Sequence, residues 1–153
     1  MFREIRESDR ERYYRYADAF YHTDAVNAPV PEKNYEATFN ECLRSDTYVK
    51  CFIFEYEGMP CGFSLLSKTF SQEAGGISVT IEEIYIEEEY RGKGLASEFF
   101  TYLKSLPNIM RLRLEVEDYN KGAKRLYERM GFSLLPYEQM VIDRQRQEGI
   151  LAE

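Results

Sequence analysis

A short, basic, glycine-rich turn is the part of this sequence best suited to bind an anion. It spans residues 91–96, Arg-Gly-Lys-Gly-Leu-Ala, and lies between a strand-like segment and the start of an amphipathic helix. The first amides of a helix lack intrahelical partners and lie at the positive end of the helix dipole, so they can bind a diphosphate. The glycines let a phosphate approach the backbone, and Arg91 and Lys93 add positive charge. A tight turn that only starts a helix can have the same sequence, so both interpretations stay open.

The strand-like segment before this turn changes the phase of its apolar residues. Val79 and Ile81 are at odd positions, whereas Ile84 and Ile86 are at even positions. One extra residue in a strand produces this shift, which is how a β-bulge appears in a sequence. We place the bulge at residues 82–83, a pair of glutamates. A buried strand whose charged pair lies at a solvated edge is the alternative interpretation.

A third candidate region is a short helix over residues 120–132. Asn120 is a favoured N-cap residue, and Gly131 is typical of a C-cap. Asn120, Ala123 and Tyr127 are separated by three and four residues, so they share one face of the helix. The small Ala123 leaves room beside the phenol of Tyr127. The phenol of Tyr127 can act as an acid. The alternative interpretation is that Tyr127 only packs in the core.

In this order and spacing, these segments resemble the GNAT superfamily of acyl-CoA-dependent N-acyltransferases. The resemblance covers roughly residues 77–135 and rests on the bulged strand, the Arg-x-x-Gly-x-Ala turn and the pattern Asn-x-x-Ala-x-x-Leu-Tyr-x-x-x-Gly-Phe. The sequence pattern of residues 82–94 is most similar to that of small diamine and polyamine acetyltransferases, but similar patterns occur in members with other amine substrates. Two positions depart from the family pattern, since Glu88 stands where many members carry proline and Ala96 replaces the commoner last glycine of the turn.

The resemblance implies that acetyl-CoA binds where the strands over residues 79–86 and 110–116 splay apart. Backbone amides of the first strand would pair with the pantetheine arm, as a peptide pairs with a strand edge. The amides of the turn and the Arg91 side chain would bind the diphosphate, and Asn120 would reach the amide region of the cofactor. The cofactor-binding residues implied in this way are Ile84, Tyr85, Ile86, Arg91, Gly92, Lys93, Gly94, Leu95, Ala96, Asn120, Ala123 and Tyr127.

The resemblance also implies catalytic roles. The attacking amine must be neutral, because an ammonium with a pKa of about 10 has no lone pair. Glu82 matches the position of the base in polyamine acetyltransferases and would act directly or through water, and Glu83 is the alternative base. An amide of the bulged strand would stabilise the oxyanion, and Tyr127 would protonate the departing CoA thiolate.

The acceptor-binding residues are expected around an aromatic and polar loop between two helices. These residues are Tyr21, His22, Asp24 and Glu82. Two further carboxylates, Glu32 and Glu36, can help Asp24 to hold a distal ammonium, and Tyr48 and Tyr137 can wall the site. For His22, a hydrogen bond within the loop is the alternative to a role as a base.

The charge balance excludes some partners and favours others. The chain has 27 acidic and 20 basic residues and a net charge of −7, which argues against nucleic acid and favours a small cationic amine. No apolar signal region or membrane-spanning run is present in the sequence, so we expect a cytoplasmic protein without a membrane partner. The chain has three cysteines, Cys42, Cys51 and Cys61. Their number is odd and their spacing is not that of metal ligands, which predicts reduced thiols and no metal site.

The remaining residues predict one α/β (α+β) domain over residues 1–153, with the GNAT fold. We expect a mixed central sheet of about seven strands, a bulged and splayed strand pair, and about four helices on both faces. Strands are predicted at residues 2–6, 48–56, 61–69, 79–86, 110–116, 132–135 and 137–143. The first predicted helix is capped by Ser8 and runs to about Phe20. The others are predicted from Glu32 to about Arg44, from Gly94 to just before Pro107, and over residues 120–132. Many members of the superfamily dimerise, so a homodimer is possible.

Three classes of function are compatible with these patterns. The first is an acetyl-CoA-dependent N-acetyltransferase that acts on a small amine or on a protein or peptide amine. The second is a module of the same fold that binds acyl-CoA without turnover. The third is a nucleotide-phosphate enzyme, but the spacing of a P-loop is missing because Leu95 follows Gly94 where lysine is required.

Overall fold

The computed structural model describes residues 1–23 and 30–144, and its central feature is a five-stranded mixed sheet. The strands lie in the spatial order β1-β2-β3-β4-β5, which is also their order along the chain. Their bounds are β1 Phe2–Glu4, β2 Val49–Tyr56, β3 Met59–Ser71, β4 Gly76–Ile86 and β5 Ile109–Leu114. Neighbouring strands are antiparallel except for β4 and β5, which are parallel. The predicted mixed sheet is therefore confirmed.

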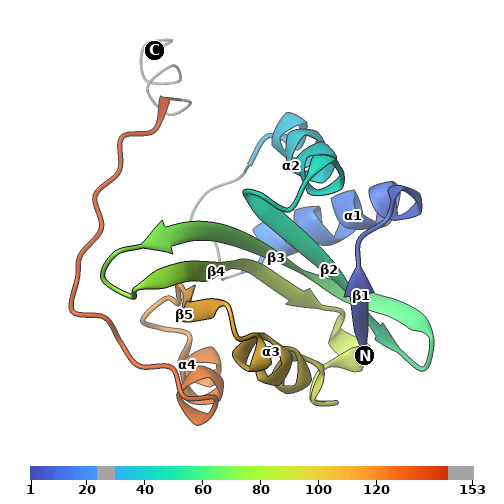
Figure 1. Ribbon diagram of the computed structural model, residues 1–153. Coiled ribbons are helices and arrows are strands. Elements are labelled where there is room, and N and C mark those ends of the chain that lie inside the picture. The colour runs from blue at the N-terminus through green and yellow to red at the C-terminus, as the bar shows by residue number, and fades with distance from the viewer. Residues whose placement is uncertain (24–29, 145–153) are drawn as a thin grey trace.

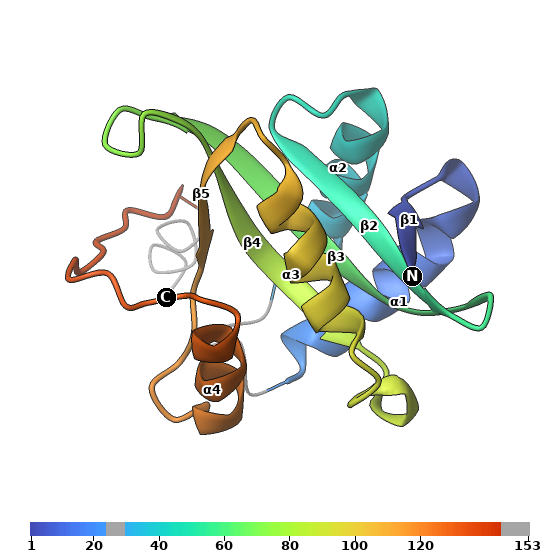
Figure 2. The same cartoon turned by 60° about the horizontal axis from the view of Figure 1, so that its bottom comes forward.

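Helices cover both faces of this sheet, as predicted. Helices α1 (Arg10–Tyr21) and α2 (Glu32–Arg44) lie on one face, and α3 (Leu95–Ser105) and α4 (Lys121–Arg129) lie on the other (Figures 1 and 2). Two short 3-10 turns, Glu7–Asp9 and Glu88–Tyr90, precede α1 and follow β4. Ser8, the predicted cap of the first helix, lies instead within the first of these turns, and α1 begins at Arg10 with Asp9 as its N-cap residue.

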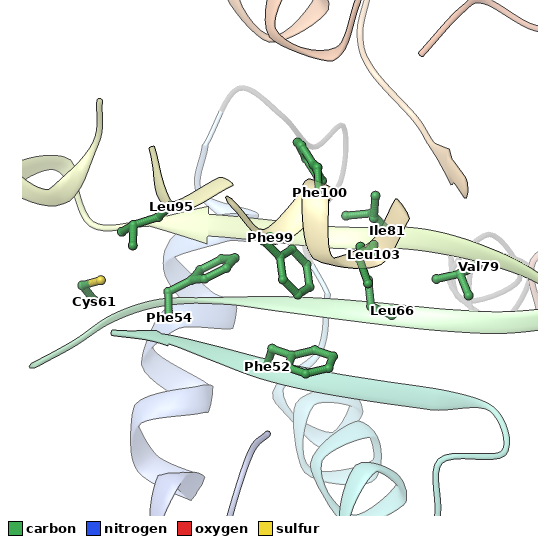
Figure 3. Close-up of a cluster of buried hydrophobic side chains, with 10 residues drawn as sticks. All are labelled: Phe52, Phe54, Cys61, Leu66, Val79, Ile81, Leu95, Phe99, Phe100 and Leu103. Carbon is green, nitrogen blue, oxygen red and sulfur yellow. The ribbon is translucent and has the colours of Figure 1, made fainter. Parts of the chain in front are cut away.

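Each face of the sheet packs its own hydrophobic core. Under α3, the ring of Phe99 is fully buried and points toward the sheet beside Phe52 and Phe54 (Figure 3). Its centroid lies 5.1 Å from that of Phe2 and 5.3 Å from that of Phe52. On the other face, Tyr13 and Phe39 of α1 and α2 pack against Ile53 and other buried residues of β2 and β3. Side chains alternate between the two faces of a strand, so the apolar run of β2 supplies both cores. In this way α3 is fixed to one face of the sheet, and α1 and α2 are fixed to the other.

The strands predicted at residues 132–135 and 137–143 are wrong. Both segments lie within the described residues and neither forms a strand, so the described sheet has five strands instead of about seven. Residues 133–143 form irregular chain that runs past the outside of β5 (Figure 1). The side chains of Met140, Val141 and Ile142 are 100%, 76% and 83% exposed. The apolar residues of this segment suit a strand. A strand also needs the edge of another strand to pair with, and this segment does not pair with β5.

Gly62 on β3 is required by the close approach of β4. A Cβ atom added at Gly62 would lie 2.2 Å from the carbonyl oxygen of Tyr85 and 3.0 Å from the Cα atom of Ile86. Both atoms belong to the backbone of β4, which cannot move without disturbing the β3–β4 ladder. We therefore expect Gly62→Ala to lower the free energy of unfolding by about 1–3 kcal/mol, measured by urea denaturation.

The matched control for this substitution is Gly122→Ala on α4. A Cβ atom added at Gly122 would meet no atom within 4 Å, and alanine is the better helix former. We expect this variant to unfold at the same urea concentration as the parent or at a higher one. An unchanged midpoint for Gly62→Ala would contradict the close approach of the two strands.

Within the described ranges, no helix is both long enough and apolar enough to cross a membrane.

Candidate active site

The predicted bulge is present in β4 at Glu82. In the register between β3 and β4, Leu66 is opposite Ile81 and Leu65 is opposite Glu83, so Glu82 is the extra residue. This extra residue lets Ile81 and Ile84 pack into the same core beneath α3, although an odd number of positions separates them. The phase shift in the sequence is therefore explained by the bulge.

A cleft opens directly beyond this bulge, where β4 and β5 separate. The last paired residues of the two strands are Ile81 and Leu114, whereas β4 continues as far as Ile86. The cleft has a volume of about 390 Å³. It is lined by Phe20, Tyr21, Ile81, Glu82, Ile84, Leu114, Glu115, Val116, Glu117, Asn120 and Tyr127. Five residues that the sequence assigned to the site therefore converge here, from α1, β4 and the region of α4.

The cleft is acidic. Glu82, Glu115 and Glu117 line it, and its lining contains no lysine or arginine from the described part of the chain. The sequence-based prediction missed Glu115 and Glu117. A signal was available, because the two residues follow β5 at a spacing of two, which in extended chain places side chains on one side. A cationic ligand would be favoured in such a cleft.

The two glutamates of the bulge lie in opposite environments. Glu82 is exposed and its carboxylate accepts a hydrogen bond from the hydroxyl of Ser67. Glu83 is only 7% exposed, and its Oε1 atom accepts a hydrogen bond of 2.5 Å from the hydroxyl of Tyr21. Burial raises the pKa of Glu83 to about 7, although the hydrogen bond from Tyr21 acts in the opposite direction. The negative charge of Glu82 raises this pKa further.

The raised pKa of Glu83 predicts a pH-dependent cost to stability. A carboxyl whose ordinary pKa is 4.5 but whose folded pKa is about 7 contributes stability that is fully present below pH 4.5 and is lost as the pH rises through 7. Glutamine cannot ionise at this position. We therefore expect the stability of Glu83→Gln relative to the parent to increase by about 3 kcal/mol between pH 4.5 and pH 8.

Urea denaturation of the parent and the variant over this pH range measures the difference, because all other titrating groups are common to both. A difference that stays constant with pH would show that Glu83 ionises at its ordinary pKa in the folded protein.

Helix α4 places Tyr127 at the cleft through its N-cap. The side-chain Oδ1 atom of Asn120 accepts a hydrogen bond of 3.1 Å from the amide of Ala123, which is the predicted N-cap interaction. The ring of Tyr127 lies edge-on to Phe100 and Phe132, with centroid distances of 5.9 and 6.0 Å. Burial raises the pKa of Tyr127, so its hydroxyl stays protonated at neutral pH. Tyr127 thus packs in the core and also lines the cleft as a proton-bearing group.

The glycine-rich turn joins the end of β4 to the start of α3. Gly94 is the N-cap residue of α3 with a φ of 82°, and a Cβ atom added there would meet nothing within 4 Å. The Nε atom of Arg91 donates a hydrogen bond of 2.8 Å to the carbonyl of Ile86, which ties the turn to β4. Because the side chain of Leu95 is buried, only its backbone amide is available to an anion. The open backbone and the helix N-terminus have the features that diphosphate binding requires.

Not every residue assigned to the acceptor site lies at the cleft. His22 is exposed, and its Nδ1 atom lies 2.7 Å from the carbonyl of Asp18, in line with the loop hydrogen bond given as the alternative. Glu32 and Glu36 are exposed on α2, and Tyr48 and Tyr137 do not line the cleft. Asp24 lies outside the described residues.

Comparison with known proteins agrees with this geometry. A model of the acetyltransferase (GNAT) family matches residues 3–132. Thialysine N-epsilon-acetyltransferase of Bos taurus is 34% identical over 77 residues, which cover 47% of this chain and 45% of that protein. Spermine/spermidine N(1)-acetyltransferase of Bacillus subtilis (strain 168) is 31% identical over 91 residues, which cover 56% of this chain and 60% of that protein. The chain spans about half the length of these curated relatives.

Solved structures show the same fold. The crystal structure of a possible acetyltransferase from Clostridium difficile 630 matches with a TM-score of 0.79 and 21% identity, over 94% of this chain and 96% of that one. At this identity the likeness is evidence for the fold alone. The family model, however, covers most of the chain and includes the bulge, the glycine-rich turn and Tyr127. The chain therefore belongs to the acetyltransferase (GNAT) family.

Proposed function

We propose that this chain transfers the acetyl group of acetyl-CoA to a primary amine of a small cationic acceptor. The observation that carries the proposal is the acidic cleft at the point where β4 and β5 separate, with Glu82 and Tyr127 both in its lining. The carboxylates attract a cation, and the phenol can donate a proton. The two curated relatives act on thialysine and on spermine or spermidine according to their names, which supports an amine acceptor.

Acetyl-CoA would bind along the free edge of β4 and at the turn that follows it. Residues 84–86 lie beyond the last pair between β4 and β5, so this edge is available to the pantetheine arm. The amides of residues 92–96 would bind the diphosphate at the N-terminus of α3, beside Arg91 and Lys93. Asn120 and Ala123 would lie near the cofactor from the side of α4. When bound, acetyl-CoA supplies the activated thioester.

The residues of the cleft would support direct attack in a ternary complex. Glu82 in the cleft lining would attract the ammonium, and Glu82 or the buried Glu83 beside it would take its proton. A backbone amide of bulged β4 would stabilise the oxyanion, and the hydroxyl of Tyr127 would protonate the departing thiolate. Tyr21 lines the cleft from α1 and would contact the acceptor.

The test is release of CoA thiol from acetyl-CoA in the presence of a fixed acceptor panel, with hydrolysis in the absence of acceptor subtracted. The panel contains spermidine, putrescine, thialysine, an aminoglycoside, free amino acids and a basic peptide. We expect at least one small cationic amine to stimulate release strongly. Binding of acetyl-CoA without release for any acceptor would instead favour a non-catalytic acyl-CoA-binding module, and a response to the peptide alone would move the acceptor class to protein amines.

A further inference from the structure

Tyr21 connects the cleft to a carboxyl group that the cleft itself does not reach. Tyr21 is the last residue of α1 and lines the cleft together with Glu82, whereas Glu83 is absent from the lining. The hydroxyl of Tyr21 donates its hydrogen bond to Oε1 of Glu83 at 2.5 Å. The ring of Tyr21 is fixed by stacking on Tyr35 at a centroid distance of 5.9 Å and by an edge contact with Phe20 at 5.2 Å. Tyr21 therefore lines the cleft while its hydroxyl is held on Glu83.

The surroundings of Glu83 contain no positive charge among the described residues. The titratable groups that face it are Tyr13 and Tyr21 from α1, Tyr35 and Cys42 from α2, Cys51 from β2, and Glu82 from β4. Its second oxygen, Oε2, is buried and has no hydrogen-bond partner in the part of the chain that the structure describes. The hydrogen bond from Tyr21 is thus the interaction that favours the ionised carboxylate.

We propose that Tyr21 relays a proton from the acceptor amine to Glu83, which is the terminal proton acceptor, while Glu82 holds the ammonium in the cleft. The inference rests on the proposed function and deepens it. One N–H bond of the ammonium breaks as an O–H bond forms on Tyr21, and the original O–H bond of Tyr21 breaks as one forms on Oε1 of Glu83. The amine gains its lone pair, Tyr21 stays neutral, and the carboxylate loses its negative charge. The proton returns to solvent by the reverse path after the products leave.

The environments of the two glutamates support this division of roles. Exposed Glu82 faces the cleft and can pair with a cation there, whereas buried Glu83 has a pKa of about 7, suited to accepting and releasing a proton at neutral pH. When two neighbouring carboxyl groups have different pKa values because their environments differ, they commonly take different catalytic roles.

The first test compares Tyr21→Phe and Glu83→Gln with the parent, using acetyl-CoA and the strongest acceptor of the panel. Both variants should lower kcat/KM by about 10²-fold at pH 7. The rise of kcat/KM with pH that has its midpoint near 7 in the parent should disappear in both variants, so that the rate follows only ionisation of the amine and approaches the parent rate at high pH. Tyr35→Phe is the matched control, because its ring belongs to the same aromatic cluster; it should keep the parent profile.

The second test uses an acceptor that needs no deprotonation. A β-fluorinated analogue of the same amine is already neutral at a lower pH, so the loss in Tyr21→Phe and Glu83→Gln should shrink to a few-fold or less with this analogue. Glu82→Gln should instead raise KM for the cationic amine and keep the rise of kcat/KM with pH. The midpoint of that rise should move to lower pH, because the charge of Glu82 no longer raises the pKa of Glu83.

The relay would be overturned by equal losses of the two variants with both acceptors and at every pH, which is the pattern of a structural defect. It would also be overturned by parent-like rates in Tyr21→Phe. Failure of the proposed function is distinguishable, because the parent itself would then acetylate no amine of the panel.

Discussion

Replacement of Tyr127 by phenylalanine is expected to lower kcat by about 10²-fold while binding of acetyl-CoA stays within a few-fold of the parent. Tyr127 lines the cleft, and burial raises the pKa of its hydroxyl above the ordinary value of a tyrosine, so the group carries its proton at neutral pH. Phenylalanine keeps the ring contacts with Phe100 and Phe132, so α4 should remain in place. The substitution therefore removes only the proton that the departing thiolate would receive.

Steady-state kinetics and calorimetric binding of acetyl-CoA separate the two effects. Tyr48→Phe is the control, because Tyr48 is 63% exposed and does not line the cleft. Unchanged turnover in Tyr127→Phe would remove this residue from the role of acid. Equal losses in turnover and in acetyl-CoA binding would show that the hydroxyl serves cofactor binding.

Phe99→Ala is expected to lower the free energy of unfolding by about 3–5 kcal/mol. The ring is fully buried and lies within the core beneath α3 (Figure 3). Its centroid lies 5.1 Å from that of Phe2 and 5.2 Å from that of Phe54. Removing it leaves a cavity that the surrounding rings cannot fill in a closely packed interior. Since α3 carries the glycine-rich turn at its N-terminus, the variant should also bind acetyl-CoA more weakly.

Thermal and urea denaturation measure the loss, with Phe70→Ala as the control. Phe70 is 76% exposed, so its removal should change stability by less than about 1 kcal/mol. A small effect at Phe99 would contradict the packing of α3 on the sheet.

Local signals in the sequence were sufficient for most of the fold. The helix predicted from Glu32 to Arg44 has the observed bounds, and the shift of apolar phase located the bulge at Glu82. These features depend on neighbouring residues alone. The strands expected at residues 132–135 and 137–143 do not form, because strand formation also depends on pairing with a distant edge, which local alternation cannot reveal.

The candidate site was predictable to the extent that it follows motifs. Glu82, Tyr127 and Asn120 lie at the cleft as expected, because each is placed by a local feature, the bulge or the helix face. The contact between Tyr21 and Glu83 joins residues 62 positions apart, and it depends on how α1 packs across β4. No spacing in the sequence indicates such a contact, nor the burial that raises the pKa of Glu83.

The most direct test of the account follows the acetyl group itself. The protein is incubated with acetyl-CoA labelled with ¹³C in the acetyl group and with the acceptor panel, and the products are analysed by mass spectrometry and NMR. We expect the label to appear on the nitrogen of a small cationic amine, in equal amount to the CoA released. Release of CoA without a labelled amine, or no release with any acceptor, would contradict acetyl transfer in the cleft between β4 and β5.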